Sequence, residues 1–115
     1  MNKQRRKQVA RVVAILSELD TKKPVCDYCN TIDSANELLQ DVIDDEQFAL
    51  DNMPDNLLFS QRYDDMNDGL MDLEGALSDL EISSERIRER GKFHGSDTKS
   101  VRDAIDVLRK ISKQQ

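Results

Sequence analysis

One apolar seam constrains the fold of this chain more than any other feature. Between residues 60 and 90, positions spaced alternately three and four residues apart are apolar at seven of eight places: Tyr63, Met66, Leu70, Leu73, Leu77, Leu80, Ser84 and Ile87. Heptad spacing puts these side chains on one helical face, as in helices that pack lengthwise on other helices. Gly69 and Gly75 lie off the seam, and each costs about 1 kcal/mol relative to alanine inside a helix. We therefore predict a long helix over 60–90 that needs tertiary partners.

Three further segments carry the apolar spacing of amphipathic helices, over 3–20, 34–52 and 97–112. Prolines at 24 and 54 and glycines at 91 and 95 mark the breaks between them. Ser34 is expected to cap the second helix, and Ser60 the third. No alternation of apolar and polar residues indicates a sheet. The sequence predicts an all-α fold, a single helical domain over 1–115 made of about four antiparallel helices, with a hairpin turning at 53–59.

The core expected from this composition is thin, because the chain of 115 residues has only five aromatic residues and 35% charged ones. A seam as long as that of the third helix offers more apolar surface than such a core needs. We therefore expect the protein to associate with copies of itself.

Charge is distributed unevenly along the chain, although the net formal charge is only −6. Residues 1–23 carry +5, residues 24–85 carry −16, and residues 86–115 carry +5. The acidic segment coincides with the predicted hairpin. A solvated acidic face is the simplest interpretation, but such a face can also bind a protein partner by presenting carboxylates where phosphates would lie. The candidate partner-binding residues are Asp44, Asp45, Asp65, Asp72 and Asp79.

The first predicted helix begins with five basic residues, Lys3, Arg5, Arg6, Lys7 and Arg11. Positive charge at a helix N-terminus opposes the helix dipole, so local stability does not explain the cluster. Docking of this helix on the acidic hairpin is one explanation. Contact with nucleic acid is the alternative, although no aromatic residues for base stacking are interleaved with the basic ones.

Cys26 and Cys29 form a Cys-x-x-Cys pair in a predicted loop after Pro24. A structural zinc site needs four ligands, and the chain offers only one more candidate, His94. A redox motif of the thioredoxin type would follow a strand, which this sequence lacks. Two such loops could share a zinc ion or a disulfide across a dimer, an arrangement that resembles the zinc hook of long coiled-coil repair proteins. We expect instead two reduced thiols, with no metal and no cofactor.

Catalysis is not expected from this sequence, because no nucleophile and base, phosphate-binding loop or complete metal-ligand set can be assembled. We interpret His94 as a loop residue without a catalytic role. No apolar run is long enough to cross a bilayer, and no leader peptide is recognisable, so a cytoplasmic protein that does not act on membranes is expected.

A motif at the predicted hairpin resembles one found in small acidic helical proteins of phages and prophages. The pattern E-x4-D-N-[LM]-P-[ED]-x-L-x2-S is matched here by Glu46, Asp51, Asn52, Met53, Pro54, Asp55, Leu57 and Ser60. The resemblance covers about 40 residues and implies a helical hairpin and a bacterial host cell, but no activity, because most of these proteins have no known function.

Together these features favour a non-enzymatic protein of phage type that binds a host or phage protein through its acidic hairpin. Inhibition of a host enzyme or a defence nuclease is one outcome of such binding. The alternatives are an accessory protein that binds nucleic acid through the basic first helix and a structural or assembly component of a virion.

Overall fold

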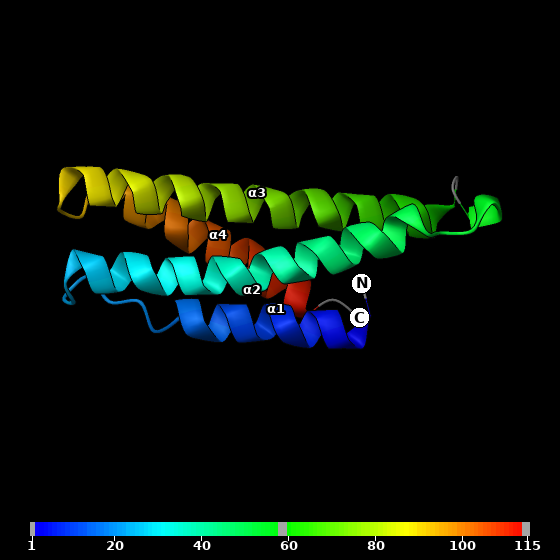
Figure 1. Cartoon of the computed structure of the whole chain (residues 1–115), viewed down its shortest axis with the longest axis horizontal. Helices are drawn as coiled ribbons and strands as arrows, with labels where there is room; N and C mark the ends of the chain where they lie inside the picture. Colours follow the sequence, from blue (N-terminus) through cyan, green and yellow to red (C-terminus); the bar gives the residue numbers. More distant parts are fainter. Residues whose placement is uncertain (1, 58–59, 114–115) are drawn as a thin grey trace.

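Over the residues that the structure describes, the protein is an all-α bundle of four helices, as predicted. The computed structural model describes residues 2–57 and 60–113. Its helices are α1 (Lys3–Leu16), α2 (Val25–Asp51), α3 (Gln61–Arg90) and α4 (Gly95–Lys113), and a short 3-10 turn, η1 (Asp55–Leu57), lies between α2 and α3 (Figure 1). The described residues contain no strand.

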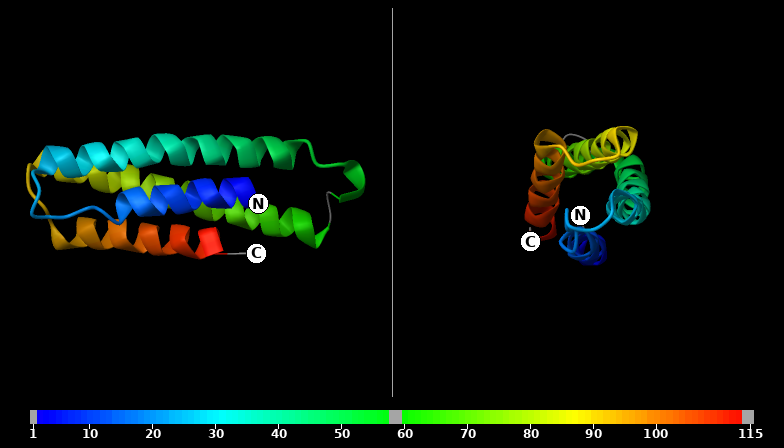
Figure 2. Two further views of the ribbon diagram at one scale, coloured as in Figure 1. Left: turned by 90° about the horizontal axis from the view of Figure 1, so that it is seen from below. Right: turned by 90° about the vertical axis from the view of Figure 1, so that its left-hand side faces the viewer.

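The helices run alternately in opposite directions, and seen end-on they lie at the four corners of a roughly square cross-section (Figure 2). Each of them contacts its neighbours in the order α1, α2, α3, α4 and back to α1, which the end-on view shows directly (Figure 2). The bundle measures 51 × 21 × 18 Å. Since α2 and α3 have 27 and 30 residues but α1 and α4 only 14 and 19, the α2–α3 hairpin projects beyond the other two helices at the end where it turns.

The heptad seam of α3 faces the interior of the bundle. Five of its residues are buried, namely Leu70, Leu73, Leu77, Leu80 and Ile87, as is Ser84. Tyr63 and Met66 are partly buried and pack against the same core. The seam is thus covered by helices of its own chain. Self-association stays a prediction, and the seam leaves no exposed apolar face to support it.

Two predicted helix ends of α3 are confirmed. The Ser60 hydroxyl accepts a hydrogen bond from the Tyr63 amide at 3.2 Å, which satisfies one of the free N–H groups of the first turn. Gly91 follows the last residue with φ of 66°, a left-handed conformation that glycine adopts without strain. Residues 58 and 59 of the predicted turn lie outside the described residues.

The predicted start of the second helix at Ser34 is wrong. The helix begins at Val25, directly after Pro24, nine residues earlier than expected. Tyr28, Cys29 and Ile32 are buried and continue the apolar stripe of α2 backward. Proline before a helix removes an N–H group that would have no intrahelical partner, so Pro24 here precedes a helix start.

The first helix is shorter than predicted and the fourth slightly longer. Helix α1 ends at Leu16 instead of residue 20, and the Ser17 hydroxyl donates to the Val13 carbonyl at 2.7 Å in its last turn. Such bonds from a serine side chain to the backbone compete with the regular hydrogen bonds of a helix. Helix α4 begins at Gly95, two residues before the predicted position.

Candidate functional site

The outward side of α2 combines carboxylates with an exposed aromatic ring. Steps of four, three and four residues join Glu37, Asp41, Asp44 and Phe48, so these side chains lie on one helical face. All four are exposed, and so is the neighbouring Asp45. We call the surface formed by Glu37, Asp41, Asp44, Asp45 and Phe48 the Phe48 face.

The ring of Phe48 is 71% exposed, the largest exposure among the large apolar side chains of the described chain. Burial of a phenylalanine is worth about 1.5–3 kcal/mol, a gain that this fold leaves unused. The buried stripe of α2 includes Leu39, Val42, Ile43 and Leu50, on the opposite side of the helix. Phe48 was not among the residues predicted to bind a partner, although its position off the apolar spacing of the helix was the available signal.

The five acidic residues predicted to bind a partner fall on two different surfaces. Asp44 and Asp45 belong to the Phe48 face. Asp65, Asp72 and Asp79 are exposed and recur every seven residues on α3, in a column that continues to Arg86. Arg86 approaches Asp97 of α4 at 4.0 Å, so this column follows the edge of α3 that borders α4. The structure therefore does not unite the five carboxylates in one site.

Negative charge is concentrated at the projecting end of the hairpin. Residues 44–68 contain eight acidic residues and a single basic one, Arg62. Glu46 is buried and accepts from Arg5 of α1 at 2.8 Å. No other carboxylate of this segment makes an ion pair with a lysine or arginine of residues 2–57 and 60–113. This end of the molecule is thus left with an excess of negative charge that the bundle itself does not neutralise.

Some basic residues of α1 pack against the bundle, and the others point into solvent. The Arg5–Glu46 pair agrees with the prediction that this helix docks on the acidic hairpin. Arg6 is half-buried, whereas Lys3, Lys7 and Arg11 are exposed and follow one another at four-residue steps on the outer side of α1. Only these three remain well placed to contact nucleic acid.

The predicted loop around Cys26 and Cys29 is wrong, because both residues lie within the first two turns of α2. Cys26 is exposed and Cys29 is buried. The Cys29 thiol donates to the backbone carbonyl of Ser84 on α3 at 3.6 Å. A metal or disulfide shared by two copies would require Cys29 to leave this contact, so the geometry favours two separate thiols.

The α3–α4 end of the bundle is held by ion pairs. The buried carboxylate of Asp97, at the start of α4, accepts from Arg90 at 2.8 Å, and Arg88 binds Asp33 of α2. His94 lies in the connecting turn, with its Nδ1 atom 2.7 Å from the Ser96 hydroxyl, and its carbonyl accepts the backbone N–H of Asp97. These contacts are those of a residue that starts a helix, in agreement with its interpretation as a loop histidine.

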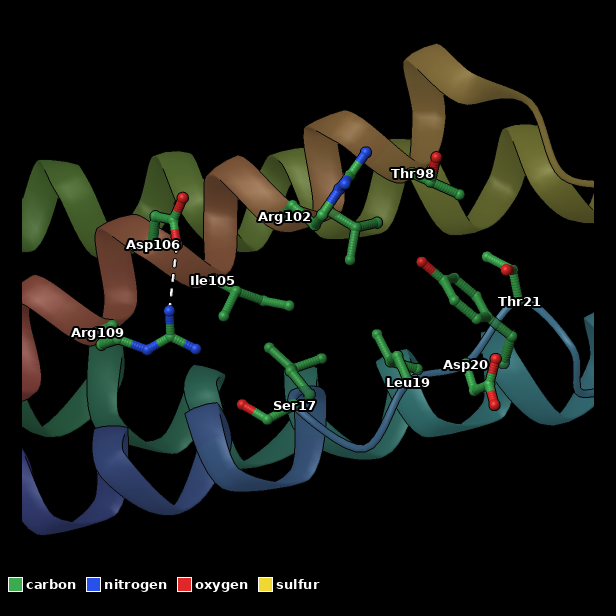
Figure 3. A pocket seen from close by; sticks show the side chains of 12 residues that line it. Ser17, Leu19, Asp20, Thr21, Thr98, Arg102, Ile105, Asp106 and Arg109 are labelled. Carbon is green, nitrogen blue, oxygen red and sulfur yellow. Dashed lines mark hydrogen bonds and ion pairs between the residues drawn. The ribbon is translucent and has the colours of Figure 1, made fainter.

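A pocket of about 600 Å³ opens between α4 and the end of α1 (Figure 3). Thr98, Arg102 and Arg109 of α4 lie on one side of it, and Ser17 and the loop that follows lie on the other.

Tyr28 of α2 also lines this pocket and is only 4% exposed. Its ring meets the edge of Phe93 with centroids 4.8 Å apart. Burial raises the pKa of the Tyr28 phenol, and the nearby Cys29 acts in the same direction, whereas the positive charge of Arg102 lowers it. The phenol therefore keeps its proton at neutral pH and can serve as a hydrogen-bond donor.

Comparison with known proteins gave no relative, since no family model, no curated protein and no solved structure matches this chain. Across residues 2–57 and 60–113, no three His, Cys, Asp or Glu side chains are grouped so that they could hold a metal ion. None of the helices in the same part of the chain is both long and apolar enough to cross a membrane.

Proposed function

We propose that this chain is a non-enzymatic protein of phage or prophage type that binds a basic partner protein through the Phe48 face. The observation that carries the proposal is the Phe48 ring, exposed among four carboxylates on a rigid helix. Aromatic residues are enriched among the side chains that dominate the energy of protein interfaces, and they are commonly surrounded by polar contacts.

The two components of this face would contribute differently to binding. Insertion of the ring into an apolar pocket of the partner would stabilise the complex by about 1.5–3 kcal/mol. The carboxylates at 37, 41, 44 and 45 would attract lysine and arginine side chains, which speeds association and selects a basic surface. A host enzyme or a defence nuclease with a positively charged groove in the bacterial cytoplasm is the kind of partner that this chemistry suits.

Affinity capture from bacterial lysate, followed by titration of the purified partner, tests the proposal. Phe48→Ser and the double variant Asp44→Asn/Asp45→Asn should each weaken binding, and the double variant should also reduce its salt dependence. Met71→Ser is the matched control for the ring, because Met71 is 62% exposed on α3. Asp72→Asn/Asp79→Asn removes the same charge from the other acidic surface. A partner that is lost with these controls and kept with the Phe48-face variants would contradict the proposal.

A second candidate function is supported by the exposed row Lys3, Lys7 and Arg11 on α1. Four residues of helix rise about 6 Å, so the three charges follow a line suited to contacts with a phosphate backbone. Titration with DNA and RNA at low and moderate salt tests this function, since phosphate contacts give a steep salt dependence. The absence of binding at low salt would exclude it.

A further inference from the structure

The pocket between α1 and α4 exists because α1 is too short to cover its neighbours. Arg5 pairs with Glu46 on the antiparallel α2, so Leu16, eleven residues further on, lies about level with residue 35. The stretch of α2 before residue 35, which includes Tyr28, extends beyond the end of α1. Residues 17–24 cross this space without a helix, leaving part of α4 facing the cavity (Figure 3).

Besides the small Thr21 hydroxyl, two stronger hydrogen-bond donors in this pocket, on Tyr28 and Arg102, have no acceptor in the described chain. Most of Tyr28 is buried, but its hydroxyl is open to solvent at the pocket and makes no hydrogen bond to residues 2–57 or 60–113. The Arg102 guanidinium, which lines the same pocket, has no ion pair within that part of the chain. Both residues line the same pocket, and the positive charge of Arg102 lowers the pKa of the Tyr28 phenol.

Apart from the Thr21 hydroxyl, the other polar groups that line the pocket are already engaged. Arg109 pairs with Asp106 at 3.3 Å, and Asp20 accepts from the Lys22 amide at 2.9 Å. The Thr98 hydroxyl donates to the Gly95 carbonyl at 3.1 Å. A ligand for this pocket should therefore supply acceptors to a cation and a phenol, which is the chemistry of an anion.

The walls further restrict the ligand. Leu16, Leu19, Val101 and Ile105 provide apolar surface, which suits an organic body more than a small inorganic ion. The carboxylates of Asp20 and Asp106 also line the pocket and would repel a ligand with several negative charges. A volume of about 600 Å³ lies within the usual range of small-molecule sites.

We propose that this pocket binds a small organic monocarboxylate, whose carboxylate contacts the Arg102 guanidinium and the Tyr28 hydroxyl and whose apolar body lies against Leu16, Val101 and Ile105. The pocket lies toward the opposite end of the bundle from the Phe48 face, so this site is independent of the proposed partner binding.

Titration of the full chain with benzoate and hexanoate, followed by amide chemical shifts in NMR, tests this site. Both carboxylates should shift the amides of residues 16–21, 28 and 98–109. Benzamide and hexanamide, which match the probes in shape but lack the charge, should bind at least about tenfold more weakly, because a hydrogen bond to a charged group is worth more than one between neutral groups. Inorganic phosphate should also bind more weakly than the carboxylates.

Two variants test separately the proposed contacts of the ligand carboxylate with Arg102 and with Tyr28. Arg102→Gln should weaken carboxylate binding about tenfold or more, and Tyr28→Phe, which keeps the ring beside Phe93, by roughly threefold to tenfold. Lys99→Gln is the matched control, since Lys99 is an exposed cation of α4 that does not line the pocket, and it should leave the affinity unchanged. The inference is overturned if no pocket amide shifts at millimolar probe, if the amides or phosphate bind as tightly as the carboxylates, or if Arg102→Gln binds normally. The comparison of carboxylate with amide needs no variant and so holds even where a substitution disturbs folding.

Discussion

Replacement of Leu80 by alanine should destabilise the protein strongly, because this seam residue is fully buried between neighbouring helices. The backbone carbonyl of Ser84, one turn further along α3, accepts a hydrogen bond from the Cys29 thiol of α2. Arg90, ten residues after Leu80, pairs with Asp97 at the start of α4. Ten residues of helix rise about 15 Å, whereas the 19 residues of α4 extend about 28 Å back along α3. Leu80 therefore lies where α3 has helices on both sides.

The size of the effect follows from this enclosure. A cavity with helices on both sides collapses poorly, and Leu→Ala substitutions in such positions cost about 2–5 kcal/mol. Against a total stability of about 5–15 kcal/mol, this loss is a large fraction. With about 4 °C per kcal/mol for a domain of this size, we expect Tm to fall by roughly 8–20 °C.

Urea unfolding followed by circular dichroism at two protein concentrations measures this effect. Ile82→Ala is the matched control, because Ile82 is 44% exposed on the same helix, and its change should stay within about 0.5 kcal/mol. The midpoint of both proteins should not depend on concentration, since the seam is covered within the chain. Equal losses in the two variants would contradict the burial of Leu80 within the bundle, and a midpoint that rises with protein concentration would show that association between chains contributes to the stability.

Three further predictions concern the ends of the bundle. Asp97→Asn should lower the free energy of unfolding in urea by about 1–2 kcal/mol. This loss is smaller than for a fully buried pair, because the arginine partners are partly exposed. Asp103→Asn, on the exposed side of α4, should have almost no effect. Burial raises the pKa of the Tyr28 phenol above its ordinary 10.0, so the folded state holds this proton more tightly than the unfolded state does. The free energy of unfolding should therefore be unaffected by this group below about pH 10 and should fall as the pH rises through the folded pKa. Tyr28→Phe should remove this part of the alkaline loss in a pH series of thermal melts. Finally, a thiol reagent should modify Cys26 quickly and Cys29 only at the rate of unfolding; equal rates for the two would contradict the contact with α3.

The periodic part of the fold could be predicted from the sequence. The alternating three- and four-residue spacing along α3 fixes which face is buried, because a helix turns by a constant angle per residue. Ser60 and Gly91 mark the ends of that helix through local chemistry, a side-chain acceptor at one end and a left-handed backbone at the other. Such signals depend on a few neighbouring residues, and they were confirmed.

The start of α2 could not be found in this way. Ser34 followed by Glu37 has the pattern of a helix start, but Tyr28 and Cys29 are buried by the bundle, and this tertiary burial extends the helix back to Val25. Local capping is worth about 1 kcal/mol, which the burial of two such side chains exceeds.

The sequence by itself thus determined that the chain forms four amphipathic helices and that its charge is divided between a negative middle and positive ends. Only the tertiary structure decided which charged residues share a surface. It separates Asp44 and Asp45 from the column on α3, turns Arg5 inward to Glu46, leaves Phe48 exposed, and opens the pocket at Tyr28. The reason is that these outcomes depend on the relative lengths and register of helices distant in sequence, which only packing of the whole bundle sets.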